Sequence, residues 1–374
     1  MARTYIHKLA DWPRFTWNPG AIASLLSEVR LQQGLLLGKM KSYGFASRRA
    51  AALKALAEET IKSSAIEGVV LDPESVLSSI AKRVGLDMAG LREHKDRNVE
   101  GVVEMMLDAT QRFEAPLTKE RLFDWHAHLF AGVRRTTDKF RVGAWRDDSQ
   151  GPMQVTSGPI GRPKIHYVAP SANRLKAEME RFLGWFESNE QQDPLLKTAI
   201  AHLWFVTIHP FEDGNGRIAR AIAEMCLARS DSSAQRFYSM SSEILEERNS
   251  YYEILAKTQS GSLDIREWLT WFLECLDRAI AHSDEITSSA LAKESFWREL
   301  KKKSVSLNPR QKKVLNKLLG DFEGKLTREK WMKLTKASSR TALRDIDELI
   351  ELGILEQEEA GGRSTSYRLK NTPS

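Results

Sequence analysis

Residues 208–220, which read IHPFEDGNGRIAR, hold an unusual amount of polar and flexible chemistry for so short a stretch. They include one imidazole, two adjacent carboxylates, an asparagine between two glycines and two arginines three residues apart. Apolar residues recur at helical spacing on both sides, which predicts a loop between two helices. A hydrophobic core cannot absorb such groups without partners, and an ordinary turn does not need them. The stretch therefore indicates a binding or catalytic site.

The two glycines favour an anion at the start of the second helix. Backbone N–H groups in the first turn of a helix have no intrahelical partner, and the helix dipole adds positive potential there. Gly214 and Gly216 flank Asn215 and allow a close approach of the backbone to a phosphate. Arg217 and Arg220 follow, and two guanidinium groups suit a polyphosphate better than a single phosphate. A plain turn followed by two solvated arginines is the alternative interpretation.

Three more residues of the stretch have candidate roles. Asp213, or Glu212 beside it, is a hard carboxylate of the kind that binds Mg²⁺ together with phosphate oxygens, and the spacing does not choose between them. The imidazole of His209 could accept the proton of an attacking hydroxyl, although a single histidine at a helix end is more often a capping or core group. Phe211 is predicted to anchor the loop to the core.

This pattern resembles the Fic motif, His-x-Phe-x-Asp/Glu-Gly-Asn-Gly-Arg-x-x-Arg, and residues 209–220 fill every defined position. The resemblance covers roughly residues 95–280, and it implies a helical core that transfers AMP from ATP to a Ser, Thr or Tyr hydroxyl of a target protein and releases pyrophosphate. It also implies the role of each residue: His209 as the general base, Asp213 as the Mg²⁺ ligand, Gly214, Asn215 and Gly216 as the anion hole, Arg217 and Arg220 on the outer phosphates, and Phe211 as a structural residue.

A second motif lies before this core. The stretch SSAIEG at residues 63–68 fits the inhibitory pattern Ser/Thr-x-x-x-Glu-Gly/Asn of many Fic proteins, with Ser63, Glu67 and Gly68 at the defined positions. The resemblance implies that Glu67 pairs with Arg220 and keeps it from the γ-phosphate, so the enzyme inhibits itself. In some relatives this glutamate helps to remove AMP from a target, so an enzyme that works mainly as a de-AMPylase is an alternative. An ordinary helix end before a glycine is the plain interpretation.

A β-hairpin is expected at residues 153–168, in a stretch rich in glycine and proline. It matches the flap of the Fic family, which would receive the target. An extended target segment can pair with the free edge of a hairpin. Val155, Thr156 and Ser157 are the predicted docking edge.

The composition indicates a soluble globular protein, with 41% hydrophobic and 28% charged residues. No window approaches the length of a transmembrane helix, and no secretory signal is visible, so we expect a cytoplasmic protein without membrane contact. Cys226 and Cys275 lie in apolar, helix-like runs and are interpreted as buried free thiols.

The periodicity predicts a mainly α fold with the hairpin as a small β element. Gly34, Gly38 and Gly44 are expected to interrupt the Ala- and Leu-rich helical pattern of residues 20–65. Further helices are expected over these ranges: a start at 72–73, then 98–112, 118–131, 171–188, 194–207, 215–228, 241–257 and 264–300. The predicted domains are an N-terminal helical domain with the inhibitory helix at 1–94, a Fic core at 95–285, a connecting helix at 286–303 and a winged helix at 304–374.

The C-terminal segment carries the net positive charge of the chain. Residues 301–374 contain 17 Lys+Arg and 10 Asp+Glu, whereas the remainder is close to neutral. Three helices and two strands are expected there, and Arg340 and Arg344 in the predicted recognition helix could contact DNA. The acidic run DIDELIELG argues against DNA contact, because it places carboxylates on the later part of the same helix. Winged helices also serve as protein-docking modules. A DNA-binding regulator with a nucleotide-sensing Fic core, and a Fic enzyme with another phosphate donor, therefore remain alternatives. The family resemblance also implies a homodimer.

Overall fold

The computed structural model describes residues 4–85, 96–132, 141–149, 151–157, 164–188, 192–319, 322, 324–358 and 365–370. The fold is mainly helical, as predicted. Contacts between residues divide the chain into two units, Met1–Ser283 and Asp284–Ser374. The elements of the first unit are η1 (Ile6–Lys8), α1 (Pro19–Lys41), α2 (Phe45–Ile66), α3 (Pro73–Arg83), α4 (Arg97–Gln111), α5 (Lys119–Leu129), β1 (Gln154–Ser157), β2 (Lys164–Val168), α6 (Ala172–Phe186), α7 (Pro194–Ile208), α8 (Asn215–Asp231), α9 (Met240–Glu246), α10 (Arg248–Gln259) and the first part of α11 (Arg266–Lys302).

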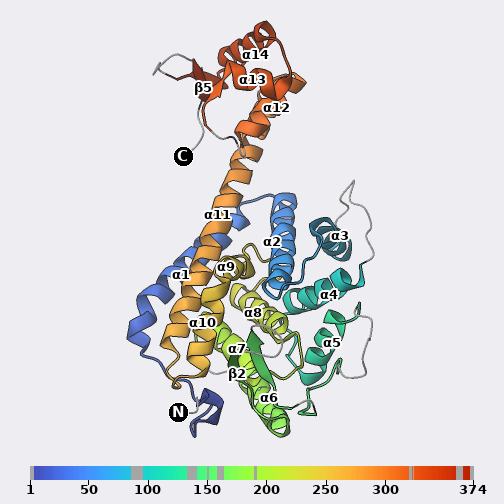
Figure 1. Ribbon diagram of the computed structural model, residues 1–374. Coiled ribbons are helices and arrows are strands. Elements are labelled where there is room, and N and C mark those ends of the chain that lie inside the picture. The colour runs from blue at the N-terminus through green and yellow to red at the C-terminus, as the bar shows by residue number, and fades with distance from the viewer. Residues whose placement is uncertain are drawn as a thin grey trace. The chain divides into compact units, whose positions relative to one another are not determined.

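Two helices, α7 and α8, form the centre of the first unit, and α2, α4 and α5 pack against α8 (Figure 1). Asp193 caps α7 by accepting hydrogen bonds from the N–H groups of Leu195 and Leu196, and Pro194 occupies its first position. From Leu195 to Ile208 nearly every residue of α7 is buried. A helix that is apolar on all sides belongs in the interior of a protein. The candidate site therefore begins at the end of a fully buried helix.

The N-terminal helices share one apolar core with the rest of the first unit. Val29 of α1, Leu56 of α2 and Ile222 of α8 belong to the same cluster. The buried carboxylate of Glu59 on α2 accepts hydrogen bonds of 2.9 Å from Ser239 Oγ and from the N–H of Ser241. Such bonds offset the cost of burying a charge. They fix α2, which carries the predicted inhibitory motif, against α9. The predicted domain boundary at residue 94 stays a prediction.

Two expectations about the helices were wrong, and one short strand had not been expected. Gly34 and Gly38 do not interrupt the first helix, since α1 runs unbroken from Pro19 to Lys41 and both glycines face open space on its surface. A glycine costs only about 1 kcal/mol within a helix, which packing of the buried face can offset. The single helix expected at 241–257 is two helices, α9 and α10, that meet at Glu247. A short strand at 326–327 was not expected at all.

The predicted hairpin is present as β1 and β2, which pair antiparallel. Val155 lies opposite Tyr167 and Thr156 lies opposite Ile165, so the register shifts between Val155 and Thr156. Such an irregularity bends a strand and changes the direction of its side chains. The predicted turn at 158–163 lies outside the described residues.

The second unit contains the end of α11, then α12 (Pro309–Leu318), β3 (Leu326–Thr327), α13 (Arg328–Thr335), α14 (Ser339–Glu351), β4 (Leu355–Gln357) and β5 (Ser366–Leu369). Its strands form an antiparallel sheet in the order β3-β5-β4. The three helices surround the fully buried Trp331. A capping box between Asn308 and Gln311 starts α12. These helices and two of the strands are those expected from the sequence, and the winged-helix interpretation stays a prediction.

Both cysteines are buried and free, as predicted. In the described part of the chain, no helix has the length and apolar character needed to cross a membrane.

Two units with separate cores predict two unfolding transitions. Trp331→Ala should lower only the transition of the second unit, because loss of a buried tryptophan costs about 3–5 kcal/mol. For a unit of this size that corresponds to a fall of roughly 15 °C or more in Tm. Differential scanning calorimetry measures both transitions. Lys333→Ala, an exposed position on the same helix, is the control and should leave them in place. A single transition that moves as a whole would contradict two separate cores.

Candidate functional site

The loop between α7 and α8 is held in shape by the side chain of Asn215. Its Oδ1 accepts a hydrogen bond of 3.0 Å from the N–H of Phe211, and its Nδ2 donates one of 2.8 Å to the carbonyl of Phe211. Asn215 is 2% exposed, so both bonds are shielded from water. The Asn215 amide thus closes the loop of residues 211–215 by bonding to both the N–H and the carbonyl of Phe211. This role differs from the one implied by the family, although the two do not exclude each other.

Phe211 anchors the loop, as expected. Its ring is fully buried and stacks on the imidazole of His126, with centroids 4.2 Å apart and planes at 12°. The Nδ1 atom of His126 accepts a hydrogen bond of 3.0 Å from the N–H of Gly143, and the backbone of Asp213 also hydrogen-bonds to this histidine. Burial lowers the pKa of His126 to about 4, so the ring is neutral near pH 7. His126 therefore connects α5, the 143 turn and the candidate site.

His209 adopts a left-handed backbone conformation, with φ 53° and ψ 58°, directly after α7. Its Nδ1 atom lies 3.3 Å from the carbonyl of Val206. A carbonyl only accepts hydrogen bonds, so Nδ1 carries the proton and Nε2 carries the lone pair. Burial lowers the pKa of His209 to about 4; the Val206 carbonyl acts in the opposite direction, and the Arg146 guanidinium lowers it further. The ring is thus neutral at pH 7 and able to accept a proton at Nε2.

Sequence reasoning missed Arg146, which holds the backbone of His209 in place. Its Nε donates a hydrogen bond of 2.7 Å to the carbonyl of His209, and its Nη2 donates one of 2.5 Å to the carbonyl of Pro170. Its Nη1 pairs with Asp148 at 3.1 Å. The Arg146 side chain is 1% exposed, so its guanidinium lies in the interior. No spacing or periodicity singled out an arginine inside a Gly- and Pro-rich stretch.

The start of α8 has the features of an anion site. Gly214 precedes the helix with φ 82° and, as a glycine at the N-cap, supplies no side chain to cap the first turn. A Cβ atom added to Gly216 would lie 2.0 Å from Oε1 of Glu67. The Glu67 carboxylate therefore rests directly on the backbone of Gly216, where the helix dipole and the unpaired N–H groups favour negative charge. A larger residue at position 216 would exclude it.

Arg220 joins the two motifs that the sequence singled out. It is 2% exposed and donates hydrogen bonds of 2.8 Å from Nε to Ser63 Oγ, and from Nη2 to the carbonyl of Ser63 and to Oε1 of Glu67. Its Nη1 is buried and has no hydrogen-bond partner among the described residues. The predicted contact between Glu67 and Arg220 is therefore present, with Ser63 as a second partner.

Arg217 lies on the neighbouring side of the same turn. It is 6% exposed, and its guanidinium stands 5.2 Å from the ring centroid of Phe130 and 3.6 Å from Oδ2 of Asp213. Its Nε is buried without a hydrogen-bond partner among the described residues. Arg217 and Arg220 thus each retain at least one donor that a bound anion could use.

The end of α2 places Glu67 with a backbone turn. Gly68 has φ 79°. Its N–H donates a hydrogen bond of 2.9 Å to the carbonyl of Ala65, and the N–H of Val69 donates one of 3.0 Å to the carbonyl of Ser64. Glycine is the residue that adopts this helix-ending conformation at least cost. Although burial alone would raise the pKa of Glu67, Arg220 and then Arg217 hold it below its ordinary value. Glu67 is consequently a carboxylate at neutral pH.

Two residues of α10, which sequence reasoning also missed, hold the end of α2, one through the Glu67 carboxylate and one through the backbone. Tyr252 donates a hydrogen bond of 3.3 Å from its hydroxyl to Oε2 of Glu67. Arg248 donates one of 2.7 Å from Nε to the carbonyl of Ile66. The predicted inhibitory motif is therefore held from both α8 and α10.

Asp213 fits a cation better than Glu212 does. The Asp213 side chain is 64% exposed, and its Oδ2 faces Arg217. Its Oδ1 accepts a hydrogen bond of 2.6 Å from the N–H of Gly214. Glu212 instead accepts a hydrogen bond of 3.2 Å from the N–H of Arg141. No group of three His, Cys, Asp or Glu that could hold a metal occurs within the described ranges. A single carboxylate nonetheless suits Mg²⁺ that arrives on phosphates.

The hairpin strand β2 reaches the same end of α7. The hydroxyl of Tyr167 donates a hydrogen bond of 2.7 Å to the carbonyl of Thr207, two residues before His209. Val155 packs against the small cluster of Tyr5, Tyr167 and Ala169, whereas Thr156 is exposed. Ser157 pairs with Lys164 in the ladder. Of the three predicted docking residues, Val155 is thus partly committed to packing.

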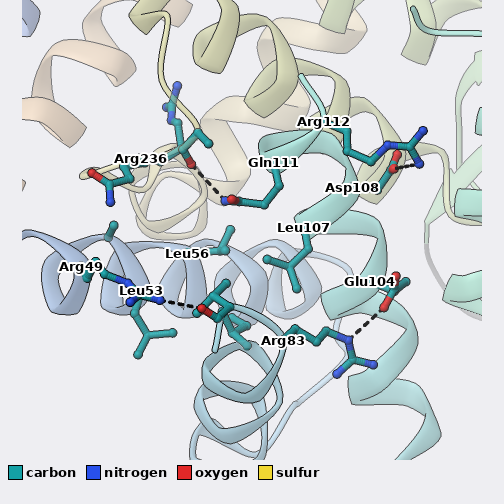
Figure 2. A pocket seen from close by; sticks show the side chains of 15 residues that line it. Arg49, Leu53, Leu56, Arg83, Glu104, Leu107, Asp108, Gln111, Arg112 and Arg236 are labelled. Atoms are coloured by element: carbon teal, nitrogen blue, oxygen red, sulfur yellow. Dashed lines mark hydrogen bonds and ion pairs between the residues drawn. The ribbon is translucent and has the colours of Figure 1, made fainter. Parts of the chain in front are cut away.

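A separate hollow of about 600 Å³ lies between α2, α3 and α4, and no residue of the 209–220 motif lines it (Figure 2). Its charged groups are largely paired within the chain: Arg83 with Glu104 at 2.9 Å and Arg112 with Asp108 at 3.0 Å. The side chain of Arg49 donates a hydrogen bond to the carbonyl of Val84. These lining charges are therefore occupied by contacts within the chain.

Comparison with known proteins agrees with the motif. Residues 116–227 match the model of the Fic/DOC family, which covers α5 to most of α8 and includes every residue of the loop. The chain contains a Fic/DOC domain. Residues 5–86 match a second family model, described as a domain of unknown function (DUF4172). The Fic resemblance noted in the sequence is thereby confirmed.

The Fic domain also has relatives among curated and solved proteins. The chain is 24% identical over 237 residues to a protein adenylyltransferase Fic of Drosophila grimshawi, and the match covers 63% of this chain and 44% of that protein. A protein of the same name from Nematostella vectensis is 32% identical over 118 residues, which is 30% of this chain and 25% of that one. The chain thus spans less than half the length of these two relatives.

A crystal structure of a Fic family protein from Desulfovibrio desulfuricans shares the fold, with a TM-score of 0.52 and 22% identity. The match covers 97% of this chain and 99% of that chain.

Replacing Arg146 should raise the pKa of His209. Arg146→Gln removes a positive charge that disfavours the imidazolium, so the pKa should move from about 4 toward 6.5. An NMR titration of the His209 ring measures it. Arg146→Lys keeps the charge without the forked hydrogen bonds, and is the control that should hold the pKa closer to 4. Equal pKa values in the wild type and the Gln variant would contradict the electrostatic contribution.

Acid should destabilise the first unit through its buried histidines. Burial lowers the pKa of His202 to about 3, against 6.5 for the unburied group. Below pH 6.5 the unfolded chain binds protons that the folded chain does not, so the free energy of unfolding falls as pH decreases toward 4. The slope is about 1.4 kcal/mol per pH unit for each such histidine. Urea unfolding between pH 7.5 and 4.5 should show a shallower slope for His202→Gln, by about that amount for one histidine. An unchanged slope would show that His202 titrates normally.

Proposed function

We propose that this chain transfers AMP from ATP to a Ser, Thr or Tyr hydroxyl of a target protein and releases pyrophosphate. The observation that carries the proposal is the pairing of a proton acceptor with an anion site. His209 presents its lone pair at Nε2, and six residues later α8 begins with the uncapped N–H groups after Gly214. The Fic/DOC domain and the name of the curated relatives, protein adenylyltransferase Fic, support the same activity.

The proposed step assigns a task to each residue of the motif. His209 Nε2 takes the proton of the target hydroxyl while the hydroxyl oxygen attacks the α-phosphorus. The bond between the α-phosphorus and the bridging oxygen breaks, and pyrophosphate leaves. The N–H groups of Asn215 and Gly216 would bind phosphate oxygens, Arg217 and Arg220 would bind the outer phosphates, and Asp213 would hold Mg²⁺. The ion would neutralise charge on the phosphates. These tasks are mostly positioning and charge stabilisation, which dominate phosphoryl chemistry.

Bound ATP would also correct the weak basicity of His209. A pKa of about 4 means that the free imidazole is a poor base. Triphosphate charge beside the ring favours the imidazolium and raises the pKa, because opposite charges attract more strongly in a shielded site. The base would therefore be strengthened only when the nucleotide is present.

We also propose that Glu67 inhibits this reaction. Its carboxylate rests on Gly216 and accepts a hydrogen bond from Arg220, which are the two groups assigned to phosphate binding. A phosphate cannot occupy the same position, and two adjacent negative charges would repel each other. Release requires that the end of α2 moves away from Arg220, Tyr252 and Arg248. Ser63 would move with Glu67, since both bind the same guanidinium.

The target is proposed to dock on the hairpin. β1 pairs only with β2 in the described sheet, so its other edge is available for an extended segment of a target. Thr156 and the backbone of Val155 and Ser157 would make the contacts. The cytoplasmic location expected from the sequence remains a proposal as well.

The proposal is tested by labelling with ATP that carries the isotope at either the α- or the γ-phosphate. The reactions contain Mg²⁺ and the wild type, Glu67→Gly or His209→Ala, with and without a cell lysate as the source of targets. Protein label should come from α-labelled ATP only, should increase at least about tenfold in Glu67→Gly, and should vanish in His209→Ala. Tyr252→Phe, which removes one hydrogen bond to Glu67 and keeps the ring, should increase labelling less than Glu67→Gly does.

Label from γ-labelled ATP would indicate a kinase and overturn the proposal. No label from Glu67→Gly, while that variant still binds ATP, would overturn AMP transfer and point to de-AMPylation or another donor. Equal labelling by wild type and Glu67→Gly would retain the transferase and remove the inhibitory role of Glu67.

A further inference from the structure

The outward face of α14, in the second unit, carries a charge pattern with no counterpart in its own chain. A shallow groove along this face is lined by Arg340, Arg344, Asp347 and Glu351, together with Ser339, Leu343 and Glu348. The first four residues follow at intervals of four, three and four, so they share one face of the helix. All four are exposed. The buried side of α14, with Ala342, Ile346 and Leu349, faces the core of the unit.

Most of these charges have no partner within the unit. Arg344 pairs with Glu348 at 3.2 Å, and both side chains remain largely exposed. Arg340, Asp347 and Glu351 make no ion pair with any residue in the described part of the chain. Their order also opposes the helix dipole, which favours acids near the N-terminus of a helix and bases near its C-terminus. In α14 the arginines come first and the acids follow, so the isolated face is electrostatically unfavourable.

The positions of the four charges are symmetric along the helix. Arg340 and Glu351 are equally distant from a point between Asp345 and Ile346, and so are Arg344 and Asp347. A two-fold axis at this point would lay a second α14 antiparallel on the first. Arg340 would then stand level with Glu351 of the second copy, and Arg344 with Asp347 of the second copy. Each N-terminal half would also gain acidic neighbours and each C-terminal half basic ones, which corrects the unfavourable order.

We propose that the α14 face is an interface between two copies of this chain. The same surface patch meets itself across a two-fold axis, as in most homodimers, and four ion pairs form between the copies. DNA is disfavoured because three carboxylates, those of Asp347, Glu348 and Glu351, share the groove with only two arginines and would face phosphates. A helix face of this size, joined by exposed ion pairs, gives a weak association that salt reverses.

The experiment is sedimentation velocity of the full chain over a concentration series, at about 0.1 M and about 1 M NaCl, where the Debye length falls from about 10 to about 3 Å. The wild type should form dimers at low salt that dissociate at high salt. Arg340→Glu and Glu351→Arg should each weaken the dimer about tenfold or more, because each creates two repulsive pairs.

Combining the two charge reversals distinguishes a specific ion-pair interface from a general loss of stability or solubility. An equimolar mixture of the Arg340→Glu and Glu351→Arg chains should restore association, since a mixed dimer contains two attractive pairs between positions 340 and 351, one with its original sign and one with reversed sign. The double variant Arg340→Glu/Glu351→Arg should restore it within one chain. Lys312→Glu, an exposed reversal on α12, is the matched control and should leave the dimer unchanged. Circular dichroism and Tm of each variant show that it is folded.

Several outcomes would overturn the proposal. A wild type that remains monomeric at low salt up to its solubility limit would do so, as would a dimer that both single variants leave intact. A random-sequence DNA duplex provides the other arm. DNA binding that Arg340→Glu abolishes and Glu351→Arg strengthens, with no restoration of self-association in the mixture, would assign the face to DNA.

Discussion

The buried guanidinium of Arg220 is the constraint on which the candidate site depends. A charged group with 2% exposure is costly unless anions or hydrogen-bond acceptors surround it. At the second turn of α8 the helix dipole raises that cost. The chain meets the requirement with three acceptor atoms from the end of α2, two on Ser63 and one on Glu67. The turn at Gly68 and the hydrogen bonds from α10 help to keep these acceptors in place.

The site therefore joins two kinds of rigidity. The loop that carries His209 is fixed from inside, by the amide of Asn215, the ring of Phe211 and the fork of Arg146. The end of α2 is held by three hydrogen bonds from Arg220, two to Ser63 and one to Glu67, and by single hydrogen bonds from Tyr252 and Arg248. The first set lies in the interior and is costly to break. The second set can be exchanged for bonds to another anion, because Arg220 needs an acceptor and not a particular residue.

Much of this site was predictable because its chemistry lies in continuous sequence. The loop from His209 to Arg220 contains its own helix boundaries, glycines and charges, so its spacing alone indicated an anion site. The partner of Arg220 was also found, because Ser63, Glu67 and Gly68 fill the inhibitory pattern of the Fic family, and the resemblance implied the pairing. Helix starts such as that at Asp193 and Pro194 were likewise visible in local signals. The mainly helical fold followed from the same periodicity.

Other parts could not be predicted because they depend on contacts distant in sequence. Arg146 contacts His209 across 63 positions, and Tyr252 contacts Glu67 across 185. Nothing in their own neighbourhoods distinguishes them from ordinary polar residues. The opposite error occurred at Gly34 and Gly38, where a local signal for a break was overridden by the buried residues of α1 on the other side of the helix.

Gly216 limits which substitutions the chain can accept during evolution. The absence of a side chain there makes room for the Glu67 carboxylate, and the same open backbone is what any phosphate would need. A substitution that blocks one anion blocks the other. Under the proposed inhibition, the Glu67 carboxylate and a phosphate compete for the same position, so mutation can tune their balance only from the α2 side. A substitution at Gly216 would therefore affect the Glu67 contact and phosphate binding together. A substitution that changes how firmly the end of α2 is held would affect the Glu67 contact alone.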